Sequence, residues 1–434
     1  MASSPPSESD DSSRAPAGDD DLCLPEETSL EEKPPEEESP ARASPTRRGF
    51  LKKTALGAAG VAGAGTLAAC GGGGNAGSGA PAVQATERVR WRLASSFPRS
   101  LDVIYGAAEV LSTRLEELTG GNFQVRPYPA GELVPAFEVL SAVQRGTTQM
   151  GHSASYYFIG KNPALAFDAC VPFGLTARQY NAWMYYGEGM ELMRELFADF
   201  NVHNLPGGNT GMQMGGWFNQ QIDTRQDLQN LRMRIPGLGG RVMNRLGVTV
   251  QQIPGGEIYP ALERGTIDAA EWVGPYDDQK LGFQEIVQNY YYPGWWEPGP
   301  ALTFYVNQDA WASLSAGYQH ALETAAADAN VRMLAEYDAK NPPALEELLN
   351  QGVKLRRFPD DVMRAAEEAS RAMLEEQATG DLYRRIYESY KGWRSDAYRW
   401  FGTAEQAYAS FAYERDFGEA APAERGTTTS PQAG

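Results

Sequence analysis

Hydrophobic and polar positions alternate regularly from Val89 to Leu93. In the segment VRWRLASSF, the apolar residues Val89, Trp91 and Leu93 are separated by polar ones, which is typical of a strand with one buried face. Residues 101–121 then carry apolar side chains at helical spacing and end in two glycines, a common helix stop signal. Residues 122–131 return to a strand pattern. Strand, helix and strand in this order predict an α/β sheet.

Two later segments share one pattern of residues. Residues 138–153 and 257–272 both fit E-x-x-x-A-x-x-R-G-T, and in each the glycine after the arginine is expected to end a helix before a strand. Each segment is also preceded by a strand with a proline-containing turn. Two helix ends can resemble each other by chance, but the shared upstream strand favours two related α/β lobes.

The same strand and helix periodicities predict the elements of the second lobe and of the C-terminal part. Residues after about 305 become helical, with apolar side chains at helical spacing. In such two-lobed α/β sheets, ligands bind outside the carboxyl ends of the strands, in the crevice between the lobes. The expected strands of the second lobe lie in residues 210–218, 231–237, 248–254 and 269–274, with a short helix in residues 240–247.

Composition separates the beginning of the chain from the rest. The formal net charge is −18, and residues 1–45 hold 13 of the 56 acidic residues but only three basic ones. With many prolines and serines and few aromatic residues, this segment is predicted to be a disordered acidic extension. The negative charge of the chain also argues against nucleic acid as a partner.

The next segment resembles an export signal. Arg47 and Arg48 precede a weakly hydrophobic Ala/Gly run, as in twin-arginine signals, and residues 67–70 (LAAC) resemble a lipobox that would make Cys70 the lipidated first residue. The apolar run of 16 residues, 54–69, is too short and too rich in glycine for a good membrane span, and a short buried helix is the alternative. On the signal interpretation, the protein works outside the cytoplasm.

The sequence thus predicts seven segments. They are a disordered acidic extension (1–45), a twin-arginine signal with a lipobox (46–70), a flexible tether (71–85), a first α/β lobe (86–210), a second α/β lobe (211–305), a helical region that completes the first lobe and ends in a dimerisation helix (306–415), and a disordered tail (416–434).

Residues typical of catalytic centres are sparse. The histidines His152, His203 and His320 are widely spaced, and the sequence contains neither a nucleophile elbow nor a phosphate-binding loop. With Cys70 assigned to lipid, Cys170 is expected to be a core residue and not part of a disulfide framework. A transition-metal site is not expected, although carboxylates could still act in acid–base catalysis.

Four polar residues lie at strand ends or loops of the second lobe. Arg234 could bind a carboxylate through two parallel hydrogen bonds, and Gln213 offers an amide oxygen and a donor. Glu271 ends the strand after the repeated helix, and Glu297 follows an aromatic run. Each could instead be an ordinary strand or solvated residue, and Glu271 could pair with an arginine or cap a turn. A hard cation such as sodium or calcium would offset the cost of placing these carboxylates beside aromatic side chains, because such a cation binds oxygen ligands.

Four motifs carry a resemblance to a known family. GGNTGMQMGGWF, LRMRIPGLGGRVM, ALERGTIDAAEWVGPYDD and YYYPGWWEPGP resemble the solute-binding subunit of tripartite ATP-independent periplasmic (TRAP) transporters, and within it the branch that binds 2-oxo acids. The resemblance covers roughly residues 86–415. It implies a two-lobed periplasmic-binding-protein (venus-flytrap) fold with long C-terminal helices. It also implies a receptor that delivers an organic acid to a sodium-driven TRAP permease in the membrane.

The resemblance also assigns roles to residues. Arg234 is similar to the arginine that pairs with the substrate carboxylate, and Gln213 to the side chain that touches both substrate and ion. Glu271, the backbone carbonyl of Trp272 and Glu297 resemble metal ligands, and Tyr157 would close over the ligand from the first lobe. Trp272 also belongs to the expected substrate-binding set. The implied ion is sodium, although counting charges slightly favours calcium.

Alternatives to this function remain. The ligand could be a hydroxy acid such as lactate bound with calcium, and an exported carboxylate-dependent lyase or hydrolase is the alternative of another class. In the 2-oxo-acid branch a long terminal helix exchanges between subunits, and residues Leu382, Ile386, Tyr390 and Trp393 lie along one helical face. A homodimer is therefore expected, with docking of this helix on its own lobes as the alternative.

Overall fold

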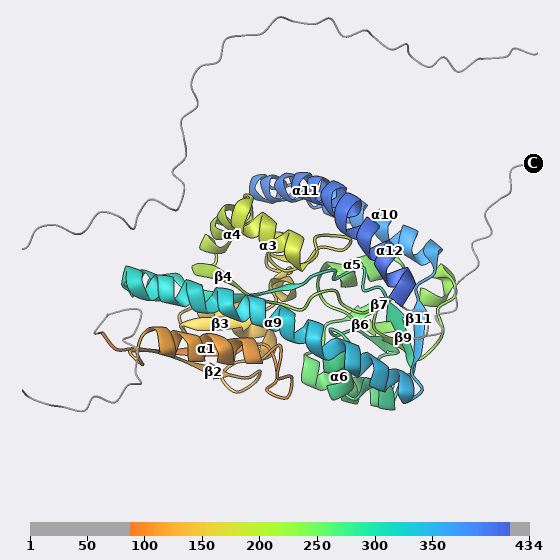
Figure 1. Ribbon diagram of the computed structural model, residues 1–434, viewed down its shortest axis with the longest axis horizontal. Helices are drawn as coiled ribbons and strands as arrows, with labels where there is room; N and C mark the ends of the chain where they lie inside the picture. The colour runs from red at the N-terminus through yellow and green to blue at the C-terminus, as the bar shows by residue number, and fades with distance from the viewer. Residues whose placement is uncertain (1–86, 417–434) are drawn as a thin grey trace, which may run out of the picture. The chain divides into compact units, whose positions relative to one another are not determined.

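The structure is a computed structural model that describes residues 87–416 (Figure 1). The acidic extension, the export signal with Arg47, Arg48 and Cys70, the tether up to residue 86 and the tail from residue 417 lie outside the described residues. Within the described part, no helix combines the length and apolar character needed to span a membrane.

The first sheet has the strand order β2-β1-β3-β10-β4. The strands are β1 (Val89–Ser95), β2 (Phe123–Tyr128), β3 (Met150–Ser153), β4 (Val202–Asn209) and β10 (Ala301–Asn307). β1 pairs in parallel with β2 and β3, whereas β10 runs antiparallel to β3 and β4. The helices before β10 are α1 (Gly106–Leu118), α2 (Val139–Gln144), α3 (Ala177–Tyr186) and α4 (Gly189–Ala198), with short 3-10 turns at Ala136–Glu138, Ser155–Phe158 and Pro163–Asp168.

The second sheet has the strand order β11-β9-β5-β8-β6-β7. The strands are β5 (Trp217–Phe218), β6 (Arg232–Arg234), β7 (Thr249–Gln251), β8 (Ala269–Ala270), β9 (Asn289–Tyr292) and β11 (Lys354–Arg357). The helices are α5 (Gly237–Arg245), α6 (Gly255–Glu263) and α7 (Pro275–Lys280), with 3-10 turns at Arg225–Leu228 and Phe283–Glu285. The strand expected over residues 210–218 is confined to β5, because Gly211 and Gly216 adopt positive φ angles of 73° and 77° that interrupt an extended backbone.

The repeated sequence pattern corresponds to two repeated structural units. Gly146 and Gly265 follow α2 and α6 with φ angles of 69° and 63°, and in both cases the next residue closes the helix. The Thr147 amide donates to the Ala142 carbonyl and the Thr266 amide to the Ala261 carbonyl, each at 2.9 Å. The strands that follow, β3 and β8, occupy matching positions in their sheets, between a parallel and an antiparallel neighbour. The two-lobed α/β fold expected from the sequence is confirmed.

The chain after residue 307 is largely helical and contacts both lobes (Figure 1). The helices are α8 (Gln308–Ser313), α9 (Ala316–Asn350), α10 (Asp360–Glu376), α11 (Asp381–Phe401) and α12 (Ala407–Asp416), with a π-helical turn at Gly402–Gln406. α9 packs against α1 and β4 and also against α7, while α10 packs against α5 and α11 against α3 and α4. Because β11 also joins the second sheet, this region contributes to both lobes and not to the first alone.

Close packing of α9 on the first sheet depends on a glycine pair in β4. A Cβ atom on Gly208 would lie 2.5 Å from the Met333 side chain of α9, and one on Gly207 would lie 2.2 Å from the Phe304 ring. Such distances are below normal contact, so the sequence PGGN permits both the helix and β10 to approach the strand.

The apolar face of α11 docks within the chain. Ile386 and Tyr390 are buried, and the hydroxyl of Tyr390 accepts a hydrogen bond of 2.8 Å from the backbone amide of Leu175 in the first lobe. The Trp393 indole donates to the Gln179 carbonyl at 3.3 Å. This face therefore packs against its own first lobe, which corresponds to the alternative considered for the helix.

Candidate functional site

Arg234 and Glu271 lie together at the carboxyl ends of two neighbouring parallel strands. Arg234 is the last residue of β6 and pairs in register with Ala270 of β8, so Glu271 follows directly beside it. Both side chains are only 1% exposed. One guanidinium nitrogen of Arg234 binds the Glu271 carboxylate and donates to the Glu271 carbonyl at 2.8 Å, while Nε donates to the Ile253 carbonyl at 3.0 Å. Glu271 thus pairs directly with an arginine in the described structure.

Trp272 forms a wall beside this ion pair. The Arg234 guanidinium lies 5.0 Å from the centre of the Trp272 ring, a cation–π arrangement. The indole nitrogen donates to the Asp277 carboxylate at 3.3 Å, and that carboxylate also accepts a 2.7 Å bond from the Tyr337 hydroxyl of α9. Gly255 leaves room for the ring, because a Cβ atom there would lie 2.6 Å from it. The indole orientation is therefore fixed from several elements.

Gln213 and Glu297 come from two loops that pass between the sheets. The backbone amide of Gln213 donates to the backbone carbonyl of Glu297 at 3.2 Å, and the side-chain nitrogen of Gln213 donates to the Thr210 hydroxyl at 3.1 Å. The Glu297 carboxylate accepts a 3.2 Å bond from the Tyr156 hydroxyl of the first lobe. Both side chains are buried. Gln213 lines the same cavity as Trp272, and Glu297 is joined to this site through Gln213 and Tyr156.

The first lobe covers the site with aromatic side chains. Tyr156 and Tyr157 lie on the 3-10 turn that follows β3, and the Tyr157 carbonyl accepts a 3.3 Å bond from the Gln252 side chain of the second lobe. The rings of Phe97 and Trp272 meet edge to face across the lobes at 6.5 Å. A small cavity between the lobes is lined by Tyr156, Tyr157, Thr210, Gln213 and Trp272, and by the apolar residues Phe97, Ile104, Ala154, Val273 and Leu302.

Burial dominates the acid–base properties of the site. It raises the pKa of Glu271 to about 8, with Arg234 opposing the shift and Asp278 adding to it. Burial, together with the negative charge of Glu271, also raises the pKa of Glu297 well above its ordinary value. Burial also raises the pKa of Tyr157 to about 12. Two carboxylates held near one arginine in a buried site favour an added positive charge.

Among the buried polar atoms that have no hydrogen-bond partner within the described residues, two belong to the expected ligand-binding side chains. They are Nη2 of Arg234, which is a donor, and Oε1 of Gln213, which is an acceptor. Buried polar atoms normally find partners, so each indicates a missing one. A carboxylate suits the arginine nitrogen and a cation suits the amide oxygen. Over residues 87–416 no cluster of three or more His, Cys, Asp or Glu side chains forms a metal site, so such a cation would depend on amide and backbone oxygens as well.

The other candidate groups form no hydrogen bond or ion pair with the site residues in the described part of the chain. His152 is buried against the rings of Phe97 and Phe304, and burial lowers its pKa to about 3. His203 stacks on Trp311, and Cys170 is a buried free thiol. These contacts give His152, His203 and Cys170 ordinary packing positions.

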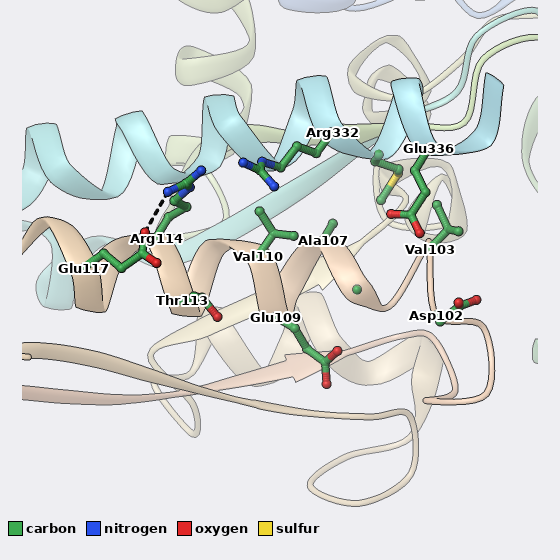
Figure 2. Close-up of a pocket in the computed structure, with 12 residues that line it drawn as sticks. Asp102, Val103, Ala107, Glu109, Val110, Thr113, Arg114, Glu117, Arg332 and Glu336 are labelled. Carbon is green, nitrogen blue, oxygen red and sulfur yellow. Dashed lines mark hydrogen bonds and ion pairs between the residues drawn. The ribbon is translucent and has the colours of Figure 1, made fainter. Parts of the chain in front are cut away.

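A separate groove of about 400 Å³ lies between α1 and α9 (Figure 2). Its floor is apolar, and its charged side chains are largely bound to one another or to neighbours. Arg114 pairs with Glu117 and Asp328, Glu109 with Arg99, and Asp102 with lysines on α7 and α9. None of the expected site residues lines this groove, and its paired charges give it no evident ligand chemistry.

The structure adds residues that sequence reasoning missed. Tyr156 binds Glu297, Thr210 orients Gln213, and Asp277 orients Trp272. Tyr156 directly precedes Tyr157 in the motif SASYYF, so the pair of tyrosines was a usable signal. Asp277 lies in the quoted GPYDD motif, yet nothing in the sequence distinguished it from an exposed helix-capping acid.

Comparison with known proteins places this chain in a family. Residues 94–381 match the bacterial extracellular solute-binding proteins of family 7, DctP. The chain is 52% identical over 325 residues to a monocarboxylate 2-oxoacid-binding periplasmic protein of Nostoc sp. strain PCC 7120, covering 75% of this chain and 89% of that protein.

Two solved structures are similar along nearly their whole length. A TRAP transporter solute-binding protein from Bordetella bronchiseptica RB50, a mixed-occupancy dimer with calcium and picolinate in one active site, is 47% identical with a TM-score of 0.75, covering 76% of this chain and 98% of that one. A TRAP periplasmic solute-binding protein from Pseudoalteromonas atlantica T6c, with sodium and pyruvate, is 40% identical with a TM-score of 0.72, covering 75% and 99%. The present chain belongs to the DctP family of bacterial extracellular solute-binding proteins.

Proposed function

We propose that this protein is a receptor for a small 2-oxo monocarboxylate of the pyruvate type, bound together with a metal ion. The observation that carries the proposal is the pair of buried unpartnered atoms, a donor on Arg234 and an acceptor on Gln213. A carboxylate on Arg234 and a cation on Gln213 would satisfy both. The names and ligands of the similar proteins support the same assignment.

The chemistry of the ligand follows from the need to join these two partners. A 2-oxo acid carries a keto oxygen next to its carboxylate, so both oxygens can reach one cation while the second carboxylate oxygen accepts from Arg234. Picolinate in the Bordetella relative likewise combines a carboxylate with a neighbouring donor atom. Lactate, with a hydroxyl in place of the keto oxygen, is the alternative ligand.

Glu271, Glu297, the Gln213 side chain and the Trp272 carbonyl are the proposed ligands of the ion. The ion would supply a positive charge that holds the keto and carboxylate oxygens of the ligand. Sodium is the proposed ion and calcium the alternative, since the similar solved proteins contain one or the other. Two acidic side chains and a ligand carboxylate against one arginine leave two excess negative charges, of which sodium neutralises one and calcium both.

The apolar part of the cavity favours a monocarboxylate. Its walls include Phe97, Ile104, Ala154 and Leu302, and no arginine or lysine is among the residues that line it. A second carboxylate buried there would lack a partner, at a cost of several kcal/mol. A 2-oxo dicarboxylate is therefore expected to bind much more weakly than pyruvate.

Titration calorimetry tests this proposal. Purified protein is titrated with pyruvate, lactate and 2-oxoglutarate in buffers that contain sodium, calcium or only a large organic cation. We expect pyruvate to bind most tightly and only with one of the metal ions. Pyruvate affinity that is equal in all three buffers, or binding of 2-oxoglutarate as tight as that of pyruvate, would contradict the proposal.

The proposed role is delivery and not catalysis. The receptor would carry its ligand to the membrane subunits of a TRAP permease for sodium-driven uptake. The alternative of an exported lyase or hydrolase predicts a product, so incubation with the same acids followed by mass spectrometry separates the two. We expect each acid to be recovered unchanged.

We also propose twin-arginine export through Arg47 and Arg48, a lipid anchor at Cys70, and a homodimer. The sequence motifs support the first two, and the dimer described for the Bordetella relative supports the third. Trp400 and Tyr408, at 64% and 72% exposure, give the C-terminal helices an aromatic surface that a second copy could cover. Metabolic labelling with palmitate tests Cys70, with Cys70→Ser as the control, and light scattering at micromolar concentration tests the dimer.

A further inference from the structure

Four arginines lie on one exposed face of the first two strands. Arg90 and Arg92 alternate along β1 with the buried Trp91 and Leu93, so both point away from the core, and Arg88 precedes them with the same spacing. Arg92 is in register with Arg126 of β2, which is also exposed. Residues paired in this way share one side of a sheet. We call Arg88, Arg90, Arg92 and Arg126 the arginine face.

The arginine face is not neutralised by nearby acids. Among the described residues, none of its four members forms an ion pair, whereas many other arginines do, such as Arg232 with Asp268 and Arg385 with Glu195. The Arg92 guanidinium donates to the Thr147 carbonyl at 2.9 Å, and Arg126 lies 4.8 Å from the centre of the Tyr128 ring.

Two acids lie beside this face. Glu87 directly precedes Arg88 and is exposed, and the Glu116 carboxylate of α1 accepts a 2.8 Å bond from the Gln124 side chain, next to Arg126 along β2. Two acids do not balance four arginines. The face therefore keeps a net positive charge and unused guanidinium donors.

The charge of the rest of the chain makes this face exceptional. The chain has a formal net charge of −18, and from Cys70 onward the charge is still −12, because residues 1–69 hold 13 of the 56 acids and seven of the 38 bases. An anionic surface would repel most of this protein. Attraction at one face and repulsion elsewhere would orient the molecule on such a surface.

The arginine face also lies where the described chain begins. Arg88 is 18 positions after Cys70, the proposed site of lipid attachment, and 17 intervening residues reach at most about 60 Å when fully extended. A molecule anchored at Cys70 would therefore keep this face within reach of the headgroups that surround its own anchor. Among anionic surfaces, the membrane is the one that this connection holds close.

We infer that the arginine face binds the anionic phospholipid headgroups of the membrane to which the protein is tethered. Guanidinium groups bind phosphate through paired hydrogen bonds, and Tyr128 places an aromatic ring beside Arg126 at the same face. This inference does not depend on which ligand the receptor binds. It rests on the proposed lipid anchor only in naming the membrane, and not another anionic surface, as the partner.

Vesicle flotation tests the inference without the anchor. The protein used is the chain from Gly71, which lacks the signal and Cys70. All described elements lie within it, and the similar solved proteins align over 98% and 99% of their own length with three quarters of this chain. It is mixed with vesicles of phosphatidylethanolamine and phosphatidylglycerol or with vesicles of phosphatidylcholine alone. We expect binding to the anionic vesicles only, weakened by added salt.

A matched pair of triple variants locates the binding. Replacing Arg88, Arg90 and Arg126 by glutamine should lower vesicle affinity about a hundredfold, at on the order of fivefold for each arginine near an anionic membrane. The control replaces Arg264, Arg364 and Arg384 by glutamine. These arginines are also exposed, lie on other elements and form no ion pair within the described residues, and the control removes the same charge. It should lower affinity less than about threefold.

Three results would overturn the inference. The first is no binding to anionic vesicles by the unmodified chain, and the second is an equal loss in both triple variants, which would indicate net charge alone. The third is a variant of the arginine face that binds vesicles normally but fails in uptake with the permease, which would assign the face to an acidic protein surface. Pyruvate titration of each variant keeps these results separate from the proposed ligand, because it should be unchanged throughout.

Discussion

The two lobes share a frame but contribute different chemistry to the site. In each lobe, two neighbouring strands run parallel and a third strand pairs with the first of them. A short segment after this third strand enters the cleft. In the first lobe this segment carries Tyr156 and Tyr157, and in the second it carries Glu271 and Trp272. Equivalent glycine caps end the corresponding helices of the two lobes. The residues that follow the strands can therefore differ between the lobes without changing the fold. The duplicated unit positions a site, and the residues after its third strand decide what the site binds.

This division of labour has an energetic consequence. Arg234 donates to the carbonyls of Ile253 and Glu271 within its own lobe, so these bonds do not depend on a ligand and the guanidinium loses little freedom on binding. The first lobe adds the Tyr156 hydroxyl and aromatic cover, both across the cleft. We therefore expect charged contacts of the second lobe to dominate affinity, and contacts between the lobes to tune it.

The largest effect is expected for Arg234→Ala. Removing the guanidinium takes away the proposed carboxylate partner and leaves Glu271 buried without its own, although Glu271 can take up a proton because burial raises its pKa to about 8. Ligand affinity should fall at least a hundredfold, and the free energy of unfolding by roughly 3 kcal/mol. Arg234→Lys should also bind poorly, because it lacks the forked donors. Calorimetry and thermal unfolding measure the two effects.

Arg232→Ala provides a matched control on the same strand. Arg232 is 43% exposed and pairs with Asp268 at the surface, so its loss should cost less than about 1 kcal/mol and leave affinity unchanged. If both alanine variants bound pyruvate equally well, the charged contacts of the second lobe would not govern binding.

The next largest effect concerns Glu271 and the ion. Under the proposed function, Glu271→Gln should weaken pyruvate binding about tenfold, and removal of the metal ion should weaken binding by the unmodified protein similarly. The informative quantity is the remaining ion dependence of the variant, which should be small. If Glu271 only holds Arg234 in place, affinity will fall but the ion dependence will stay unchanged. Asp268→Asn, on the same segment but paired with Arg232, is the control.

Much of this arrangement was predictable from local patterns. The repeat around Gly146 and Gly265 predicted two related lobes because a helix cap is a local structure that a few residues specify. Arg234 was recognisable from its place at the end of an expected strand. The direct pairing of Arg234 with Glu271 was only an alternative, because they are 37 positions apart in the sequence and the register of β6 with β8 decides the contact.

Contacts between distant segments were not predictable. β11 has four residues, KLRR, whose pattern is too short to indicate a strand, and its pairing with β9 arises only in the folded chain. Tyr156 meets Glu297 across 141 positions of sequence, and nothing local indicates which of two adjacent tyrosines makes the contact. Sequence patterns thus located the pieces, and the tertiary arrangement selected their partners.

A smaller effect is expected for Tyr156→Phe, a change in the first lobe. The variant keeps the ring and loses the hydroxyl that donates to Glu297 at 3.2 Å. A bond of this kind contributes about 1 kcal/mol, so pyruvate affinity should fall about fivefold. Tyr305→Phe is the control, because it removes a buried hydroxyl of the same lobe that contacts Ser155 and not the cleft. Equal affinities for the two variants would show that the first lobe provides cover without a specific polar contact.

The smallest effect is expected at Asp102, which lines the groove between α1 and α9 and joins the lobes there. This residue follows β1, and its carboxylate accepts from the Tyr276 hydroxyl at 3.0 Å and from Lys280, both on α7 of the second lobe, and from Lys340 of α9 at 3.2 Å. The two lysines flank the Tyr276 ring at 4.5 and 4.6 Å. Contacts between lobes exist only when the lobes are together, so they favour the ligand-bound arrangement.

Asp102→Asn should therefore raise the rate of ligand release about threefold, as expected for partly exposed ion pairs, with little change in the association rate. Burial opposes ionisation of Asp102, but bonds from Lys280, Lys340 and Tyr276 outweigh it and lower the pKa from 3.8 to about 2. The contribution is thus complete above the ordinary pKa and is lost only as pH falls toward about 2, so near neutrality salt and not pH should weaken it. Stopped-flow release of pyruvate measures the rate, and Glu109→Gln, which breaks only a pair with Arg99 inside the first lobe, is the control. Release rates that match in the two variants would mean that the ion pairs of Asp102 form when the lobes close but do not stabilise the closed arrangement.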